Sequence, residues 1–143
     1  MSGGSSLLEG YVERIAALLH EHMDLVDSIE RYVSFMASLD EVKEAHINAL
    51  KGQLENLSEL RSSLIESMEK AVEVAQGLRE GEALEDLYAL LSYYVEAGAV
   101  REISVLKKAS LFLDMEVHIE SSERAREEAS RIVDELEGLR SDR

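Results

Sequence analysis

Histidine is the residue type in this sequence with the widest chemistry near neutral pH, and His22 has the most informative position. It falls on the apolar side of an expected helix, with apolar residues at positions 18, 19, 25 and 26 around it. A buried neutral imidazole needs a hydrogen-bond partner for its N–H group. If the chain turns back near Ser38, Gln53 and Asn56 face His22 from the opposite helix. We therefore expect a polar layer of His22, Gln53 and Asn56 that sets the register of the two helices.

The same three residues are candidates for a small-ligand or metal site. Gly52 lies next to Gln53 and would leave room on the facing helix. A ligand site and a polar layer that only sets register are therefore two alternative interpretations of His22, Gln53 and Asn56.

A metal site elsewhere would need His46, Asp114 or His118. His22 and His46 cannot share an ion, because at about 1.5 Å per residue they lie about 36 Å apart on one rod, or about 15 Å apart in height in a hairpin. Asp114 and His118 are spaced to share one face of a helix, whereas in a strand they would share a solvated face with Glu116. The Glu-x-x-His and His-x-x-x-His pairs of helical metal sites are missing. We expect no metal centre, no cofactor and no catalytic residue.

Thirty acidic residues against fifteen basic ones give the chain a formal charge of −15. A surface of that sign repels phosphate backbones and anionic lipids, so neither nucleic acid nor a membrane is an expected partner. The absence of cysteine excludes disulfides and thiolate metal sites and fits a reducing cytoplasm. The first residues lack the basic and apolar regions of a secretory signal. No apolar run approaches the about 18 residues that cross a bilayer, so we expect a cytoplasmic protein.

The elements that must position these side chains begin with an apolar seam from Leu8 to Leu78. Most steps of seven along it are apolar, namely Leu8, Ile15, Ile29, Met36, Leu50, Leu57, Leu64, Ala71 and Leu78. His22 and Lys43 are the polar members of this series. A second apolar row follows three or four residues later in most of the heptads, as in helices that bury one side against another helix. The seam predicts helical structure over residues 7–79, after a flexible lead over residues 1–6.

A break in this seam falls at Ser38. Ser38 and Glu41 have the spacing of a capping box, and Lys43 occupies a seam position close by. These features favour a helical hairpin, with a first helix ending near Ala37 and a second running from Leu39 to about Arg79. The heptad register continues through the break, so one continuous helix in a two-chain coiled coil remains the alternative.

Residues 82–140 predict a small α-β-β-α module. A helix begins near Glu82 and ends at Ala97 and Gly98, where glycine favours a helix C-cap. Strict alternation of apolar and polar residues from Leu113 to Glu120 is typical of a half-buried strand, and residues 100–106 alternate roughly. Ser121 or Ser122 would cap a last amphipathic helix. The predicted fold is therefore mainly helical, of the α+β class, with an all-α helical bundle as the alternative.

These features lead to one main functional hypothesis and two alternatives. A two-stranded sheet and an uncovered seam both need a partner, so we expect a non-enzymatic structural or adaptor protein. It would act by coiled-coil self-association and protein binding, as a homo-oligomer or as a subunit of a complex. The first alternative is a small-ligand or metal binder centred on His22. The second is an acidic inhibitor of a nucleic-acid-binding protein.

Overall fold

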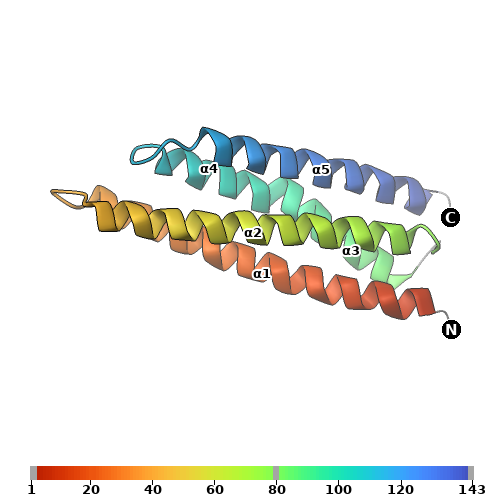
Figure 1. Ribbon diagram of the computed structural model, residues 1–143. Coiled ribbons are helices and arrows are strands. Elements are labelled where there is room, and N and C mark those ends of the chain that lie inside the picture. Colours follow the sequence, from red (N-terminus) through yellow and green to blue (C-terminus); the bar gives the residue numbers. More distant parts are fainter. Residues whose placement is uncertain (1–2, 79–80, 142–143) are drawn as a thin grey trace.

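The computed structural model describes residues 3–78 and 81–141, and these residues fold almost entirely as helices. The helices are α1 (Gly3–Ala37), α2 (Glu44–Ala75), α3 (Glu82–Tyr93), the π-helix η1 (Tyr94–Gly98), α4 (Ala99–Ala109) and α5 (Glu116–Ser141). Because α3, η1 and α4 follow one another without a break, they form one long helical rod. The described residues therefore form four rods (Figure 1).

The four rods pack as a bundle of two helical hairpins. One hairpin is α1 with α2, and the other is the α3–η1–α4 rod with α5 (Figure 1). Each rod of the first hairpin also packs mainly against one rod of the second, since α1 packs against α3 and α4, and α2 packs mostly against α5. These two contacts between the hairpins join rods that run in the same direction (Figure 1). The bundle therefore has two opposite interfaces, α1 with α3–α4 and α2 with α5, that hold the hairpins together.

The apolar seam is buried inside a single copy of the chain. Eight of its members are at most 1% exposed: Leu8, Ile15, Ile29, Met36, Leu50, Leu57, Leu64 and Ala71. The second hairpin covers the stripe that the first leaves open, with residues such as Leu87, Leu106 and Ile132. The expectation that the seam needs a second copy of the chain rested on an uncovered stripe, and that stripe is covered.

The predicted α-β-β-α module over residues 82–140 is wrong, and the all-α bundle fits instead. No strand occurs in residues 3–78 or 81–141. The buried residues of α4 recur at a spacing of three and four, which belongs to a helix; they are Ala99, Glu102, Val105, Leu106 and Ala109. The predicted first strand, residues 100–106, therefore lies within this helix.

The alternating segment from Leu113 to Glu120 divides between a loop and the start of α5. Met115 in the loop and Ile119 in α5 face the core, four residues apart, whereas Val117 is 75% exposed. Alternation in this segment therefore does not separate a buried face from an exposed one. Packing against the other three rods favoured the helical period over the two-residue period.

Several predicted helix ends also differ from the structure. Gly98 does not end a helix, because η1 continues into α4. Ser121 and Ser122 lie inside α5, which begins at Glu116. At the other end of the chain, α1 already includes residues 3–6 of the predicted lead. The predicted end of the second helix at Arg79 lies outside the described residues.

The chain reverses between Ala37 and Glu44, so α1 and α2 form the predicted helical hairpin. The alternative of one continuous helix is wrong. The predicted capping box is wrong, because the Ser38 hydroxyl donates to the Phe35 carbonyl at 2.6 Å and so closes the end of α1. At the start of α2, the backbone N–H of Lys43 donates to Nδ1 of His46 at 2.9 Å. Lys43 lies in the turn between the two helices, so it is not part of the buried seam.

Candidate functional site

Three ionisable side chains from three helices meet in the core of the bundle. His22 of α1 is 2% exposed, Arg61 of α2 is 3% exposed and Glu102 of α4 is fully buried. Burying charge in a protein core costs several kcal/mol per ion unless each charge is paired. This cluster is therefore the most unusual polar feature of the described structure.

Glu102 lies at the centre of the cluster, and each of its carboxylate oxygens has a different partner. Nε2 of His22 lies 2.6 Å from Oε1. Nε of Arg61 donates to Oε2 at 2.8 Å, and Nη2 of Arg61 lies 2.7 Å from the same oxygen. Nη1 of Arg61 donates to the Ser121 hydroxyl of α5 at 3.0 Å. All four rods thus contribute to one chain of polar contacts.

The surroundings of Glu102 hold its carboxyl group in the charged form. Burial by itself would raise the pKa of Glu102, but the hydrogen bond from His22 and the positive charge of Arg61 outweigh it, so the pKa lies below its ordinary value of 4.5. An ionised carboxylate only accepts hydrogen bonds, so the His22 contact is an N–H donated by Nε2. The remaining ring nitrogen, Nδ1, has no hydrogen-bond partner among the described residues.

The π-helix η1 lies beside this cluster and begins with Tyr94. The Tyr94 ring contacts the His22 ring edge-to-face, with centroids 5.6 Å apart. Its hydroxyl is buried without a hydrogen-bond partner in the described structure. Burial raises the pKa of Tyr94, and the negative charge of Glu102 adds to the effect. Short π-helical segments inside α-helices are frequent at functional sites, which makes this turn a second feature at the same place.

A small cavity of about 90 Å³ adjoins His22 at the interface of α1 with the α3–η1–α4 rod. Its lining is His22, Met23, Val26, Tyr93, Ala97, Gly98 and Arg101. Gly98 faces the imidazole, because a Cβ atom built on it would lie 3.8 Å from Cε1 and 3.9 Å from Nδ1 of His22. The absence of a side chain at position 98 therefore leaves this edge of the ring open.

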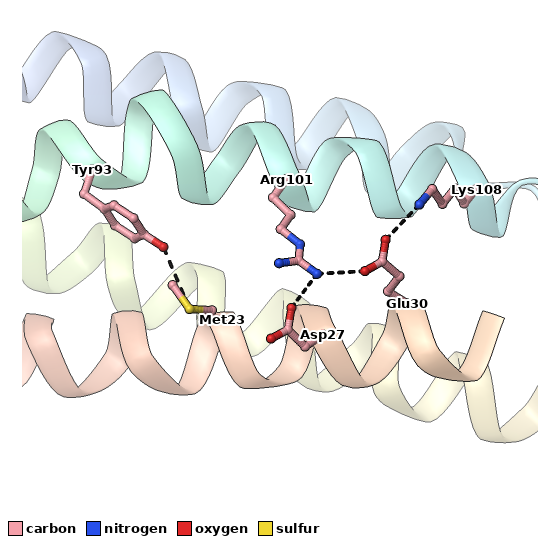
Figure 2. Close-up of polar contacts among 6 residues, drawn as sticks. All are labelled: Met23, Asp27, Glu30, Tyr93, Arg101 and Lys108. Carbon is pink, nitrogen blue, oxygen red and sulfur yellow. Dashed lines mark hydrogen bonds and ion pairs between the residues drawn. The ribbon is translucent and has the colours of Figure 1, made fainter. Parts of the chain in front are cut away.

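Polar contacts bridge α1 and the α3–η1–α4 rod along the outer side of this cavity (Figure 2). The Tyr93 hydroxyl points to the Met23 sulfur at 3.9 Å. Arg101 pairs with Asp27 at 2.6 Å and with Glu30 at 2.7 Å. Lys108 pairs with the second oxygen of Glu30 at 2.8 Å. Two basic and two acidic side chains therefore balance one another at this interface.

A second hollow, an open groove of about 530 Å³, lies where α4 passes into α5. It is lined by Ser110, Leu113, Asp114, Met115, Glu116, Ile119, Glu120 and Glu123. Its lining therefore combines apolar side chains with four carboxylates and no basic residue. The same segment carries Leu111, which is 78% exposed, and Val117, which is 75% exposed. We call this hollow the α4–α5 groove.

The structure does not bring together the three residues of the predicted polar layer. His22 contacts Glu102 and Tyr94, whereas the Gln53 amide donates to the Ser28 hydroxyl at 3.1 Å. Asn56 is exposed. The position of His22 in the core is as predicted from the seam, but its partners come from other helices.

The three metal-ligand candidates have separate places in the bundle. His46 caps α2 and stacks edge-to-face on Phe35, with ring centroids 6.0 Å apart. Asp114 is exposed and accepts the backbone N–H of Glu116 at 3.1 Å. His118 is half-buried in α5. Over residues 3–78 and 81–141, no group of three or more His, Cys, Asp or Glu side chains is arranged to hold a metal ion.

Sequence reasoning missed Arg61, Glu102 and Tyr94 as parts of the site. Arg61 and Glu102 did carry a signal, since each interrupts an apolar helical face on which a charge is costly: Arg61 between Leu57 and Leu64, and Glu102 beside Val105 and Leu106. Interpreting residues 100–106 as a strand concealed the position of Glu102.

None of the described helices combines the length and the apolar character that crossing a membrane requires. The chain matches no family model, and no curated protein or solved structure is significantly similar to it.

Proposed function

We propose that this protein is a non-enzymatic adaptor that binds a partner protein at the α4–α5 groove. The observation that carries the proposal is the chemistry of this groove, where apolar side chains lie among four carboxylates. Leu111 and Val117, on the same segment, are the two most exposed large apolar side chains of the described structure. Exposed apolar residues grouped among polar ones are typical of protein interaction sites.

The charge of the groove indicates what kind of partner fits it. Asp114, Glu116, Glu120 and Glu123 line the groove without a lysine or arginine, and the chain as a whole has a charge of −15. Among the described ion pairs, only Glu120 of these four takes part in one, a loose contact of 4.0 Å with Arg124. A partner segment with apolar side chains between lysines or arginines would match both parts of the lining.

One alternative function follows from the same charge. The basic segment would belong to a nucleic-acid-binding protein, and this chain would act as its acidic inhibitor. Competition distinguishes the two functions, because an inhibitor must displace DNA or RNA from the protein it captures. An adaptor that binds outside the nucleic-acid surface leaves that complex intact.

A labelled helical peptide of leucines and lysines is a suitable probe for the groove. Fluorescence anisotropy at low salt should show saturable binding that weakens as the salt concentration rises, because salt screens exposed charges. The double substitution Glu120→Lys and Glu123→Lys should weaken binding at least tenfold, since it reverses two of the four groove charges.

The matched control is Glu127→Lys with Asp134→Lys, which makes the same charge change at exposed positions of α5 outside the groove. This control pair should change the affinity much less than the groove pair does. Equal weakening by both pairs would mean that the peptide responds to net charge alone, and the groove proposal would then fail. Loss of binding on replacing Leu111 and Val117 by serine would support an apolar contribution.

A further inference from the structure

The cavity beside His22 has a different character from the α4–α5 groove and supports a separate inference. It lies at the opposite interface from α2 and α5, between α1 and the α3–η1–α4 rod, and it is small and partly enclosed. Val26, Ala97 and Gly98 give it a mainly apolar wall. The Cε1–Nδ1 edge of the His22 ring faces Gly98, which lines the same space.

Nδ1 of His22 is the hydrogen-bond acceptor that we assign to this cavity, because the Tyr93 hydroxyl and the Arg101 guanidinium in its lining already contact side chains of α1. The imidazole is 2% exposed, and its other nitrogen is committed to Glu102. With the proton on Nε2, a neutral ring presents a lone pair at Nδ1, which accepts a hydrogen bond. No residue of the described structure makes a hydrogen bond to Nδ1. The cavity therefore contains an unused acceptor.

The charges around the cavity indicate that its ligand is uncharged. Glu102 is balanced by Arg61. At the outer side, Arg101 and Lys108 are balanced by Asp27 and Glu30. A charged ligand would add an unpaired charge to a partly buried space, which is unfavourable.

The volume of the cavity limits the size of its ligand. An apolar cavity of about 150 Å³ holds benzene, which has six heavy atoms. By proportion, about 90 Å³ holds a group of about four heavy atoms, and a slightly larger ring can extend toward the exposed side chains of Tyr93 and Met23.

We propose that this cavity binds a small, uncharged molecule, or the end of one, that donates one N–H or O–H to Nδ1 of His22 and places a compact apolar body against Val26 and Ala97. The Glu102 carboxylate positions the ring by holding Nε2–H. Arg61 keeps that carboxylate in place from the far side.

Pyrazole and isoxazole test this proposal on the unmodified protein. Both are uncharged five-membered rings of nearly equal size, but only pyrazole carries an N–H donor. Pyrazole should bind with about millimolar affinity, as expected for so small a ligand, and isoxazole at least about tenfold more weakly. NMR titration should show saturable shifts of the Gly98 amide and of the His22 side-chain nitrogens with pyrazole.

Ala97→Leu fills the cavity from its exposed edge without touching the charged cluster and should abolish these shifts. Ala89→Leu is the matched control, because Ala89 is an exposed alanine of the same rod outside the cavity. Equal affinity for the two rings, persistence of pyrazole binding in Ala97→Leu, or the absence of shifts at His22 and Gly98 would each overturn the proposal. If Ala97→Leu does not fold, the comparison of the two rings on the unmodified protein decides the question.

Discussion

Glu102 is the residue on which the buried cluster depends, because it carries the negative charge that His22 and Arg61 both contact. Removing that charge while keeping the shape of the side chain would leave Arg61 buried without a counter-charge. An uncompensated charge in a core is among the few changes that destabilise a protein severely.

We expect Glu102→Gln to lower the free energy of unfolding by about 3 kcal/mol for this reason. Urea unfolding followed by circular dichroism at neutral pH measures the change. Glu30→Gln is the control, since it removes a carboxylate that also pairs with basic side chains but lies at the surface. Glu30→Gln, at a half-buried position, should lower the free energy of unfolding far less. A loss as large as that of Glu102→Gln would contradict the special role of burial.

The ionisation of Glu102 should also make the stability of the protein depend on pH. In the folded state the pKa of Glu102 lies below 4.5, so at acid pH the unfolded chain binds more protons at this position. The stabilisation from Glu102 is therefore complete above about pH 4.5 and is lost as the pH falls through the lowered folded-state pKa.

Comparing the unmodified protein with Glu102→Gln separates this effect from Glu30, Glu66 and Glu128, whose pKa values are also lowered. The difference in unfolding free energy between the two proteins should be constant near neutral pH and shrink on acidification. A difference that stays constant down to pH 3 would show that protonation of Glu102 is not linked to folding.

At the scale of single elements, η1 sets how α4 is turned relative to α3. A π-helical turn contains one more residue than an α-helical turn, so the residues after it are rotated around the rod. This rotation is part of what places Glu102 opposite His22 and opens the wall of the cavity at Gly98.

Deleting Glu96 should convert η1 to a regular α-helical turn, because Glu96 is an exposed residue of this segment. The deleted residue is the one by which a π-helical turn exceeds an α-helical turn, so the residues after it keep their positions around the rod and Glu102 stays in the cluster. We expect only a small loss of thermal stability, measured by circular dichroism. Deleting Ser104, an exposed residue of the regular helix α4, should instead turn the residues after it by about 100° and cause a large loss. Equal losses in the two deletions would mean that η1 does not hold an extra residue.

At the scale of the whole molecule, the second hairpin completes the core that the first hairpin begins. Because the seam is covered in one copy, the described residues leave no large apolar stripe uncovered that would require self-association. The exposed apolar side chains that remain are few and include those beside the α4–α5 groove.

Light scattering with mass determination at tens of micromolar protein should therefore give the mass of one chain, 16.0 kDa. The groove is the surface to examine if the mass is doubled. In that case the substitutions Leu111→Ser and Val117→Ser should restore the single-chain mass. A dimer that survives them would locate the self-association elsewhere.

The sequence by itself determined the features that depend on local periodicity. The seam predicted helices over residues 7–79 and the burial of His22, because a 3.6-residue repeat places these residues on one side of a helix. The reversal near Ser38 was favoured by the break in the seam, whereas the heptad register also fitted one continuous helix. It also determined the acidic surface, which follows from composition alone.

Only the tertiary structure decided the secondary structure of residues 100–120 and the hydrogen-bond partner of His22. Local alternation there was compatible with a strand, and packing against three other rods selected a helix instead. Glu102 lies 80 positions along the chain from His22 and 41 from Arg61. Contacts between residues so far apart in the sequence do not follow from the local repeat of apolar residues. A buried charge needs a partner, but which partner it has is decided by the way the helices pack together.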